Sequence, residues 1–504
     1  MKRPIAILPD PAGLYGLFVF LFLVRFAGSK TLADGDTLWH IKFGEMMLKS
    51  GRLITNDPFS HTAQGQPWLA HEWLAEIFAA GLHQIGGLPA VAIGHILLAA
   101  LAFNTLFLCA RRISNDWAAF AAISLSAAPM ATTHLLARPH LFSWLLGALT
   151  LYCLLRNDRT LWALPLLTAL WGNLHGGVLL GLVLQGAFLV GRFFDTRPWL
   201  HGFDWKCSLA EQKRPLMVLV LSILATGCNP FGFYAFLFNF QVNAEIFAVS
   251  IGEWRAADFR KLWYVRYWLV GMFLLAALYP RKERLTSLDW TWIVLLPILF
   301  YQAMTHVRHI SIAAMFAAPW LSSTLQTLWQ QRPRRPRQKK PAERAELQLS
   351  SLSGPTLTLT AGLLLLVVCW YTPPAWQEFA AERFSLPVGY SQEAVDYIAQ
   401  NRPGQRLLNE YSWGDYLIYA LDPPPSLFID GRADMYGEAI FGDYRAAAAL
   451  KPNIDDILER YEIDWILFPK NTPLVRYLER KPDWQAVYSD DKVVILALTE
   501  GSKP

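Results

Sequence analysis

At least ten stretches of this chain approach the length of about 20 apolar residues that is needed to cross a hydrocarbon core about 30 Å thick. Apolar residues make up 54% of the sequence and charged residues only 17%, a balance that is typical of a protein with many membrane spans. We therefore predict a polytopic α-helical membrane protein with about 11 transmembrane helices. They are placed near residues 11–27, 89–110, 117–131, 139–155, 160–174, 176–194, 215–231, 263–280, 288–305, 309–328 and 355–371.

Basic residues are concentrated in alternate loops between these stretches, namely at 2–3, 111–112, 156–159, 197–214, 281–284 and 332–344. By the positive-inside rule these loops are cytoplasmic, so the N-terminus is predicted to lie inside. An odd number of spans then places the C-terminal domain outside, which in a bacterium is the periplasm. The net charge of +5 is explained by this topology, and no nucleic-acid partner is expected. The first span lacks a small-residue cleavage site and is interpreted as a retained anchor in the inner membrane.

The predicted organisation is a transmembrane module at 1–371 and an extracytoplasmic α/β domain at 372–504. The module has a first external loop at 28–72, a long external loop at 232–262 and a basic cytoplasmic loop at 329–350. In the C-terminal domain we expect helices at 391–401, 413–421, 437–450 and 454–461, with strands at 406–409, 427–430 and 464–468 and a closing hairpin at 487–498. This alternation predicts a small α/β sandwich. None of the five cysteines lies in this domain, so no disulfide framework is expected.

The first external loop carries the most informative polar sequence, Ala33-Asp-Gly-Asp-Thr-Leu-Trp-His-Ile-Lys42. Acids held at a membrane boundary are costly and are a functional hypothesis by default. The alternative is a solvated amphipathic helix.

Three motifs resemble one known family. The run Asp36–Lys42 is similar to the first external loop of the oligosaccharyltransferase catalytic subunit, with Asp36 in place of the family's essential Asp and Lys42 in place of its Arg. The run Ser250–Glu253 resembles the family's Ser/Thr-hydrophobe-x-Glu motif. The run Tyr411–Tyr416 resembles its Trp-Trp-Asp-Tyr-Gly motif, and Ile429–Gly431 follows as the family's Asp-Asn does. The chain is therefore identified as a divergent member of the GT-C superfamily of polyprenol-dependent glycosyltransferases.

This resemblance implies transfer of a sugar from a polyprenyl-(pyro)phosphate-linked donor to an acceptor on the extracytoplasmic face. Asp36 and Glu253 are the implied catalytic residues, and also the metal ligands if a metal is bound. The loop at 130–140, where the family carries its acid pair, contains no acid. A divalent cation (Mg or Mn) and no cation at all are therefore equally open, with His134 and His140 as substitute ligands.

The chemistry itself requires a carboxylate base near the acceptor and positive charge on the departing phosphate. The candidate donor-binding residues are His40, Lys42, His71, Glu72, Arg138, Asn173, His175 and Arg308. Their structural alternatives are interfacial snorkelling of the arginines, helix capping at His71 and Glu72, and a tight turn at 173–175. The candidate acceptor-binding residues are Trp413, Asp415, Tyr416, Asp430 and Arg432, for which core packing and a strand-end turn are the alternatives.

The expected partners are membrane lipid, the polyprenyl-linked donor and an acceptor protein, lipid or glycan. Two other functions stay open: a non-catalytic subunit of an envelope assembly, and a transporter of a lipid-linked intermediate. Catalysis requires the residues at 36, 253, 308 and 413 to meet on one side around a single water-facing hollow.

Overall fold

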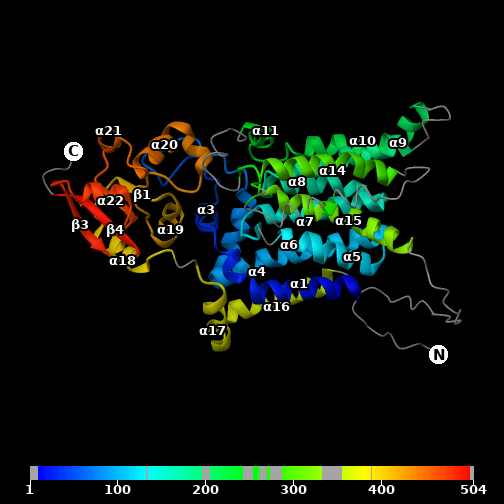
Figure 1. Ribbon diagram of the computed structural model, residues 1–504, viewed down its shortest axis with the longest axis horizontal. Helices are drawn as coiled ribbons and strands as arrows, with labels where there is room; N and C mark the ends of the chain where they lie inside the picture. The colour runs from blue at the N-terminus through cyan, green and yellow to red at the C-terminus, as the bar shows by residue number, and fades with distance from the viewer. Residues whose placement is uncertain are drawn as a thin grey trace.

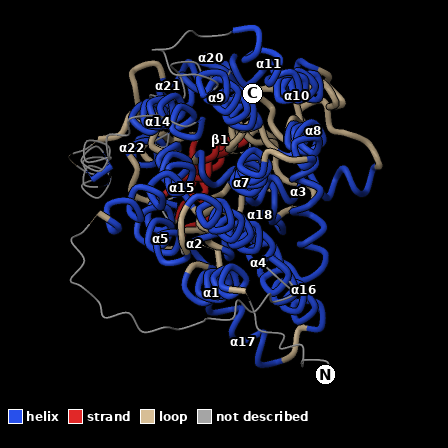
Figure 2. Tube along the Cα trace, turned by 90° about the vertical axis from the view of Figure 1, so that its right-hand side faces the viewer, coloured by secondary structure: helices blue, strands red, loops and turns tan. Residues whose placement is uncertain are grey.

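The computed structural model describes residues 10–131, 134–195, 205–241, 254–258, 287–331, 355–386 and 389–499, together with residues 260, 268 and 271–272. The chain forms a long bundle of helices with a smaller α/β domain at one end (Figure 1). Helix α3 (Asp36–Ser50) lies where the two parts meet. Seen along the long axis, the strands of the domain lie behind the bundle (Figure 2).

The bundle is built from helices that follow the apolar stretches of the sequence. Their bounds are α1 Pro11–Phe26, α2 Gly28–Thr31, α4 Trp73–Ile113, α5 Asp116–Ala122, α6 Ala128–Ala131, α7 His140–Arg156, α8 Leu164–Leu174, α9 Val178–Asp195, α10 Trp205–Ala225, α11 Phe233–Gln241, α14 Ser287–Thr305, α15 His309–Gln330, α16 Pro355–Tyr371 and α17 Pro374–Arg383. A π-helical turn, Ile123–Ala127, joins α5 to α6, and a 3-10 turn, Arg159–Ala163, precedes α8.

Helix α4 is longer than the span predicted at 89–110, because it continues back to Trp73 through a kink. Gly86 and Gly87 have non-helical backbone angles there, and Gly87 has a positive φ of 61°. A Cβ at Gly86 would collide with Cys369 of α16. The glycine pair thus lets one helix change direction while α16 packs closely against it.

Large apolar side chains are exposed on α1, α10 and α16, including Phe18 at 62%, Leu224 at 56% and Leu364 at 62%. Such surfaces are expected to face lipid rather than water. By length and composition, Trp73–Ile113 and Leu288–Thr305 can each cross a bilayer, and a pair bent by 108°, Thr356–Tyr371 with Pro374–Arg383, adds a third candidate. The count of about 11 spans stays a prediction. The expected span at 263–280 and the basic loop from 332 lie almost entirely outside the described residues.

The C-terminal domain contains a four-stranded sheet in the order β1-β2-β4-β3. Strand β1 (Leu407–Asn409) is parallel to β2 (Trp465–Pro469), and β2 and β3 (Trp484–Ser489) are both antiparallel to β4 (Val493–Leu498). The helices are α18 Gln392–Asn401, α19 Tyr411–Ala420, α20 Ala433–Ala448, α21 Ile454–Arg460 and α22 Pro473–Leu478. The helices predicted from 391 to 461, the strands at 406–409 and 464–468 and the closing hairpin are present with small shifts of their ends.

The strand predicted at 427–430 was wrong, although the segment is buried. The Asn409 side chain forms hydrogen bonds with the backbone of this segment. Its Nδ2 donates to the Ile429 carbonyl at 2.7 Å, and its Oδ1 accepts from the Phe428 N–H at 3.1 Å. At Leu427 the N–H donates to the Phe59 carbonyl, and the carbonyl accepts from the His61 N–H. Side-chain and first-loop partners therefore replace a neighbouring strand.

The first loop (residues 28–72) belongs to the core of the C-terminal domain. Trp39, Phe43 and Phe59 are buried in one apolar cluster with Trp413 and Leu467. An isolated bridge pairs Ser60 with Leu427, and the Thr62 hydroxyl donates to the Phe428 carbonyl at 2.6 Å. Packing thus ties segments at opposite ends of the sequence into one unit.

Candidate active site

Two acids lie at the start of helix α3, Asp34 just before it and Asp36 within it. Asp36 is its first residue, where the helix dipole favours a negative charge, and its N–H donates to Asp34 Oδ1 at 3.3 Å. The Gly35 between them allows close approach to α19, because a Cβ there would lie 2.8 Å from Asp415 Oδ2. The sequence Asp34-Gly35-Asp36 therefore places two carboxylates in the cluster, and the absence of a side chain at Gly35 leaves room for a third, that of Asp415.

Arg138 binds both of these acids. Its Nη1 lies 2.9 Å from Asp34 Oδ2 and its Nη2 lies 2.6 Å from Asp36 Oδ2. The segment before α7 that carries it is held by backbone bonding, since the Ala137 N–H donates to the Thr31 carbonyl at 2.7 Å. These side chains are roughly a fifth exposed, so the cluster is reached by solvent on one side.

Asp415 of α19 completes the cluster from the C-terminal domain. The Gly431 N–H donates to Asp415 Oδ1 at 2.7 Å, and a Cβ at Gly431 would overlap Asp36 Oδ1 and lie 2.8 Å from Asp415 Oδ2. Burial, followed by the negative charge of Asp36, raises the pKa of Asp415 well above its usual range. The structure thus brings together three residues selected from the sequence: Asp36, Arg138 and Asp415.

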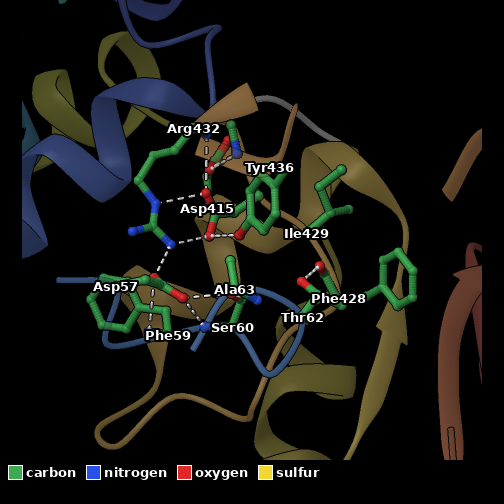
Figure 3. Close-up of polar contacts among 12 residues, drawn as sticks. Asp57, Phe59, Ser60, Thr62, Ala63, Asp415, Phe428, Ile429, Arg432 and Tyr436 are labelled. Atoms are coloured by element: carbon green, nitrogen blue, oxygen red, sulfur yellow. Dashed lines mark hydrogen bonds and ion pairs between the residues drawn. The ribbon is translucent and has the colours of Figure 1, made fainter. Parts of the chain in front are cut away.

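Asp430 and Arg432, which flank Gly431, form a buried ion network with Asp57 and Tyr436 (Figure 3). The Arg432 Nη2 contacts Asp430 Oδ2 at 2.5 Å and Asp57 Oδ1 at 2.7 Å, and Tyr436 donates to Asp430 Oδ2 at 2.6 Å. The Arg432 guanidinium also lies over the rings of Phe43, Phe59 and Trp68, at 5.2 to 5.4 Å from their centroids. Asp430 and the Arg432 side chain are fully buried and are held within this network, on either side of the Gly431 turn.

A second polar cluster surrounds Glu72. The nitrogens of His175, His71 and His40 lie 3.6, 3.8 and 3.9 Å from its carboxylate oxygens. Burial raises the pKa of Glu72 and lowers the pKa of His40 and His175, so each of these three groups is shifted towards its neutral form. Four candidate donor-binding residues from three segments therefore meet here.

Sequence reasoning missed two members of this cluster. Glu76 lies 3.4 Å from His40 Nδ1, and the Ser143 hydroxyl lies 2.7 Å from His175 Nδ1. Glu76 was detectable, because it stands four residues after Glu72 and so shares its helix face. Ser143, in the first turn of the apolar helix α7, gives no comparable signal.

Arg308 stacks on Trp254, with its guanidinium carbon 3.5 Å from the ring centroid. After burial, the positive charge of Arg308 contributes to the lowered pKa of His175. Asn173 is used for packing: Oδ1 accepts from the Trp73 indole at 2.9 Å and Nδ2 donates to the Cys228 carbonyl at 2.7 Å.

The remaining candidates lie towards the C-terminal domain or outside the described residues. Lys42 lies 3.8 Å from the exposed Asp422. Trp413 and Tyr416 are buried against Tyr390, whose ring stacks on Tyr416 at 4.3 Å. Glu253, with the motif that contains it, lies outside the described residues.

The described residues do not fit a divalent cation. Among them, no group of three or more His, Cys, Asp or Glu side chains has the spacing of a metal site. Arg138 already forms ion pairs with both Asp34 and Asp36, the acids at which such a cation would bind. No chemical step is therefore assigned to a metal.

An open hollow of about 540 Å³ lies next to the Glu72 cluster, between α4, α8 and the turn after α10. It is lined by Trp73, Leu74, Leu166, Ala169, Leu170, Asn173, Gly227, Cys228, Asn229 and Pro230. The amides of Asn173 and Asn229 are bonded to the protein itself, so the wall is largely apolar. Trp73, which lines this hollow, directly follows Glu72 in the sequence.

No protein-family model and no curated protein matches the sequence, but solved structures match the fold. The oligosaccharyltransferase of Archaeoglobus fulgidus, tethered with an acceptor peptide, superposes with a TM-score of 0.57 at 11% identity, over 91% of this chain and 68% of the other. The archaeal oligosaccharyltransferase AglB, also from Archaeoglobus fulgidus, in complex with an inhibitory peptide and a dolichol-phosphate, gives 0.55 at 12% identity, over 91% and 69%. ArnT from Cupriavidus metallidurans bound to undecaprenyl phosphate gives 0.52 at 14% identity, over 97% and 98%.

These neighbours are membrane glycosyltransferases of the GT-C type that use polyprenyl phosphate carriers. This chain therefore has the GT-C fold, as the sequence motifs indicated.

Proposed function

We propose that this protein is a glycosyltransferase of the bacterial inner membrane, with a cytoplasmic N-terminus and a periplasmic C-terminal domain. It transfers a sugar from a polyprenyl-(pyro)phosphate-linked donor to an acceptor on the periplasmic side. The observation that carries this proposal is the cluster of Asp36, Arg138 and Asp415, which is assembled by the bundle, the first loop and the C-terminal domain together. The likeness to lipid-linked glycosyltransferases supports it at the level of the fold.

The reaction asks little of a general acid, because a phosphate-linked lipid is a good leaving group. A nucleophilic atom of the acceptor attacks the anomeric carbon, the bond from that carbon to the phosphate oxygen breaks, and its electron pair leaves with the lipid phosphate. Asp36 accepts the proton that the acceptor loses, since its side chain is more exposed than that of Asp415. Arg138 holds Asp36 in one orientation.

The Glu72 cluster and Arg308 are proposed to hold the phosphate and the sugar. Arg308 supplies a positive charge, and its stacking on Trp254 fixes where that charge lies. The apolar hollow beside the cluster is suited to the first isoprenoid units of the lipid. The donor would thus lie with its lipid against α8 and its sugar towards Asp36.

The test uses the full chain in lipid nanodiscs with undecaprenyl-phosphate-linked and undecaprenyl-pyrophosphate-linked sugars from bacterial membranes. Mass spectrometry measures the lipid carrier that is released. Asp36→Asn is expected to slow release by about 100-fold or more, because the base is removed. The matched control is Asp456→Asn, an exposed carboxylate on α21. Equal rates for Asp36→Asn and the wild type would refute the proposed chemistry.

Donor binding is tested separately with undecaprenyl phosphate alone. Arg308→Gln is expected to weaken its binding about tenfold, as loss of one charge-assisted contact predicts. Arg156→Gln is the control, because it removes an arginine that pairs with Asp158 at 2.7 Å at the C-terminal end of α7, the end opposite to Arg138. Unchanged binding in Arg308→Gln would remove that residue from the donor site.

A further inference from the structure

We propose that Glu45, His83 and Tyr419 form a hydrogen-bonded bridge that positions the proposed base Asp36, because it holds together three helices from separate parts of the chain. This inference rests on the proposed function, since it assigns to the bridge an effect on sugar transfer. Each member of the bridge acts through the helix that carries it and is therefore a positioning residue.

The bridge is a chain of two hydrogen bonds centred on a histidine. The His83 Nδ1 lies 2.8 Å from Glu45 Oε1, and its Nε2 lies 2.9 Å from the Tyr419 hydroxyl. An ionised carboxylate only accepts hydrogen bonds, so in the neutral imidazole the proton lies on Nδ1 and the Tyr419 hydroxyl donates to Nε2. Burial, followed by the negative charge of Glu45, raises the pKa of Tyr419 to about 12, so this hydroxyl keeps its proton. The imidazole ring is thereby held from both sides.

Each member of the bridge belongs to a different helix. Glu45 lies on α3, His83 on α4 and Tyr419 on α19. Helices α3 and α4 are in tight contact, since a Cβ at Gly44 would collide with the Glu76 carbonyl. The bond from His83 to Tyr419 then joins a helix of the bundle directly to the C-terminal domain. The bridge therefore fixes the position of that domain relative to two helices of the other part of the protein.

The same three helices carry residues of the candidate site. Helix α3 begins with Asp36. On α19, Asp415 and Tyr419 stand four residues apart and are neighbours on one face of the helix. On α4, Glu76 and His83 stand seven residues apart, which again places them on one face. A shift of α19 or α4 along α3 therefore changes the surroundings of Asp36.

Helix α4 requires such a restraint because its regular backbone is interrupted three residues after His83. Gly86 and Gly87 have non-helical backbone angles, so the segment 73–85 is set at an angle to the rest of the helix. The bridge restrains the end of this segment against α3 and α19. The side chains of His83 and Glu45 are 23% and 32% exposed, so their bond competes with water and adds little to the stability of the fold. Its loss can therefore disturb geometry without unfolding the protein.

Kinetics of sugar transfer in nanodiscs, with the same undecaprenyl-linked sugars, test the effect on the site. Tyr419→Phe removes only a hydroxyl and is expected to lower kcat about tenfold, because small misplacements of reacting groups are costly. The KM for the lipid-linked sugar is expected to stay unchanged, since the proposed donor-binding residues are untouched. His83→Gln keeps one donor and one acceptor, so it is expected to retain more activity than His83→Leu, which loses both.

The matched control is Tyr477→Phe. It removes a phenol that donates to Asp455 at 2.6 Å within the C-terminal domain, and it is expected to keep the wild-type kcat. Thermal unfolding of Tyr419→Phe is expected to give a Tm within about 3 °C of the wild type, since one hydrogen bond is lost. Equal kcat for Tyr419→Phe and Tyr477→Phe would overturn the proposal. A Tm far below that range would also overturn it, because unfolding would then account for the lost activity.

Fluorine NMR observes the bridge without any need for activity. The full chain labelled with 3-fluorotyrosine is expected to show a Tyr419 signal, identified by its absence in Tyr419→Phe. This signal is expected to move in His83→Leu and in Glu45→Ala, and to stay in place in Glu459→Gln, which removes an exposed carboxylate on α21. A Tyr419 signal that does not respond to His83→Leu would overturn the bridge. A responsive signal in a protein that transfers no sugar would uphold the bridge and refute the proposed function.

Discussion

Arg432→Met is expected to be among the most destabilising single substitutions in the C-terminal domain. The guanidinium is fully buried and contacts two buried carboxylates, Asp57 and Asp430, at 2.7 and 2.5 Å. Removal of one partner from a buried ion pair leaves the other charge uncompensated, which costs about 3–5 kcal/mol. For a unit of this size that corresponds to a fall in Tm on the order of 10 °C. Loss of the contacts with Phe43 and Trp68 acts in the same direction.

The assay is thermal unfolding at a fixed scan rate, followed by tryptophan fluorescence, because Trp68 lies against the guanidinium. Arg460→Met is the control: Arg460 also pairs with an Asp, Asp443 at 2.9 Å, but it is 58% exposed. That exposed pair is expected to contribute less than about 1 kcal/mol.

The triple variant Arg432→Met, Asp57→Asn, Asp430→Asn separates charge from packing. It is expected to recover a large part of the lost stability, since the unpaired carboxylates are gone. Refutation would be a Tm of Arg432→Met within error of the Arg460→Met control, or a triple variant no more stable than the single one.

Close contacts at two glycines and the burial of two titratable groups lead to four further predictions. Gly431→Ala is expected to reduce transfer about 100-fold in the release assay, because its Cβ displaces the Asp36 carboxylate. Gly44→Ala places a Cβ against the backbone of α4 and is expected to cost about 1–3 kcal/mol in thermal unfolding. Burial lowers the pKa of His61 from 6.5 to about 4, so the folded state resists a proton that the unfolded chain accepts; stability is expected to fall as pH drops from 6.5 towards 4, and less so in His61→Gln. Burial raises the pKa of Asp415 above 3.8, so its stabilising contribution is lost as pH rises; Asp415→Asn is expected to gain stability over the wild type at pH 8 compared with pH 4.

Each of these has an outcome that contradicts it. Wild-type release by Gly431→Ala would mean that Asp36 does not depend on that turn. A Gly44→Ala variant as stable as the wild type would mean that α3 and α4 can separate freely. Parallel pH curves for wild type and His61→Gln, or for wild type and Asp415→Asn, would mean that the titrating group lies elsewhere.

The regular elements of this fold could be predicted because they follow local patterns. The apolar runs marked most helices of the bundle, and Ser391, which accepts a hydrogen bond from the Ala394 N–H, marked the start of α18. The predictions that were wrong failed because they depend on contacts between segments that are distant in the sequence. The segment 427–430 has the apolar composition of a strand, but Asn409 and Phe59 take its backbone groups. Helix α4 extends past its expected start because a glycine pair bends it instead of ending it.

The candidate site was predictable to the extent that its chemistry is unusual for its location. Asp36, Arg138 and Asp415 stood out as charges near membrane boundaries or in a family motif, and they meet in the structure. Arg432 was selected from the sequence on the same grounds, yet in the structure its side chain is buried and pairs with two buried carboxylates. Sequence alone does not distinguish these two situations, because the difference depends on which residues cover the side chain after folding.

The union of the first loop with the C-terminal domain also constrains how the protein is made. His61 and Leu407, which are joined at 3.1 Å, are separated by 346 positions, and Thr62 and Phe428 by 366. During synthesis, the first loop, with its tryptophan and phenylalanine side chains, cannot pack against the C-terminal domain until most of the chain has been made. A fragment that starts after the last predicted span would lack Trp39, Phe43 and Phe59 from its interior and would expose the surface they cover. This unit is therefore completed only after Phe428 has been synthesised, and a product that ends before Asp415 lacks one of the three residues of the candidate site.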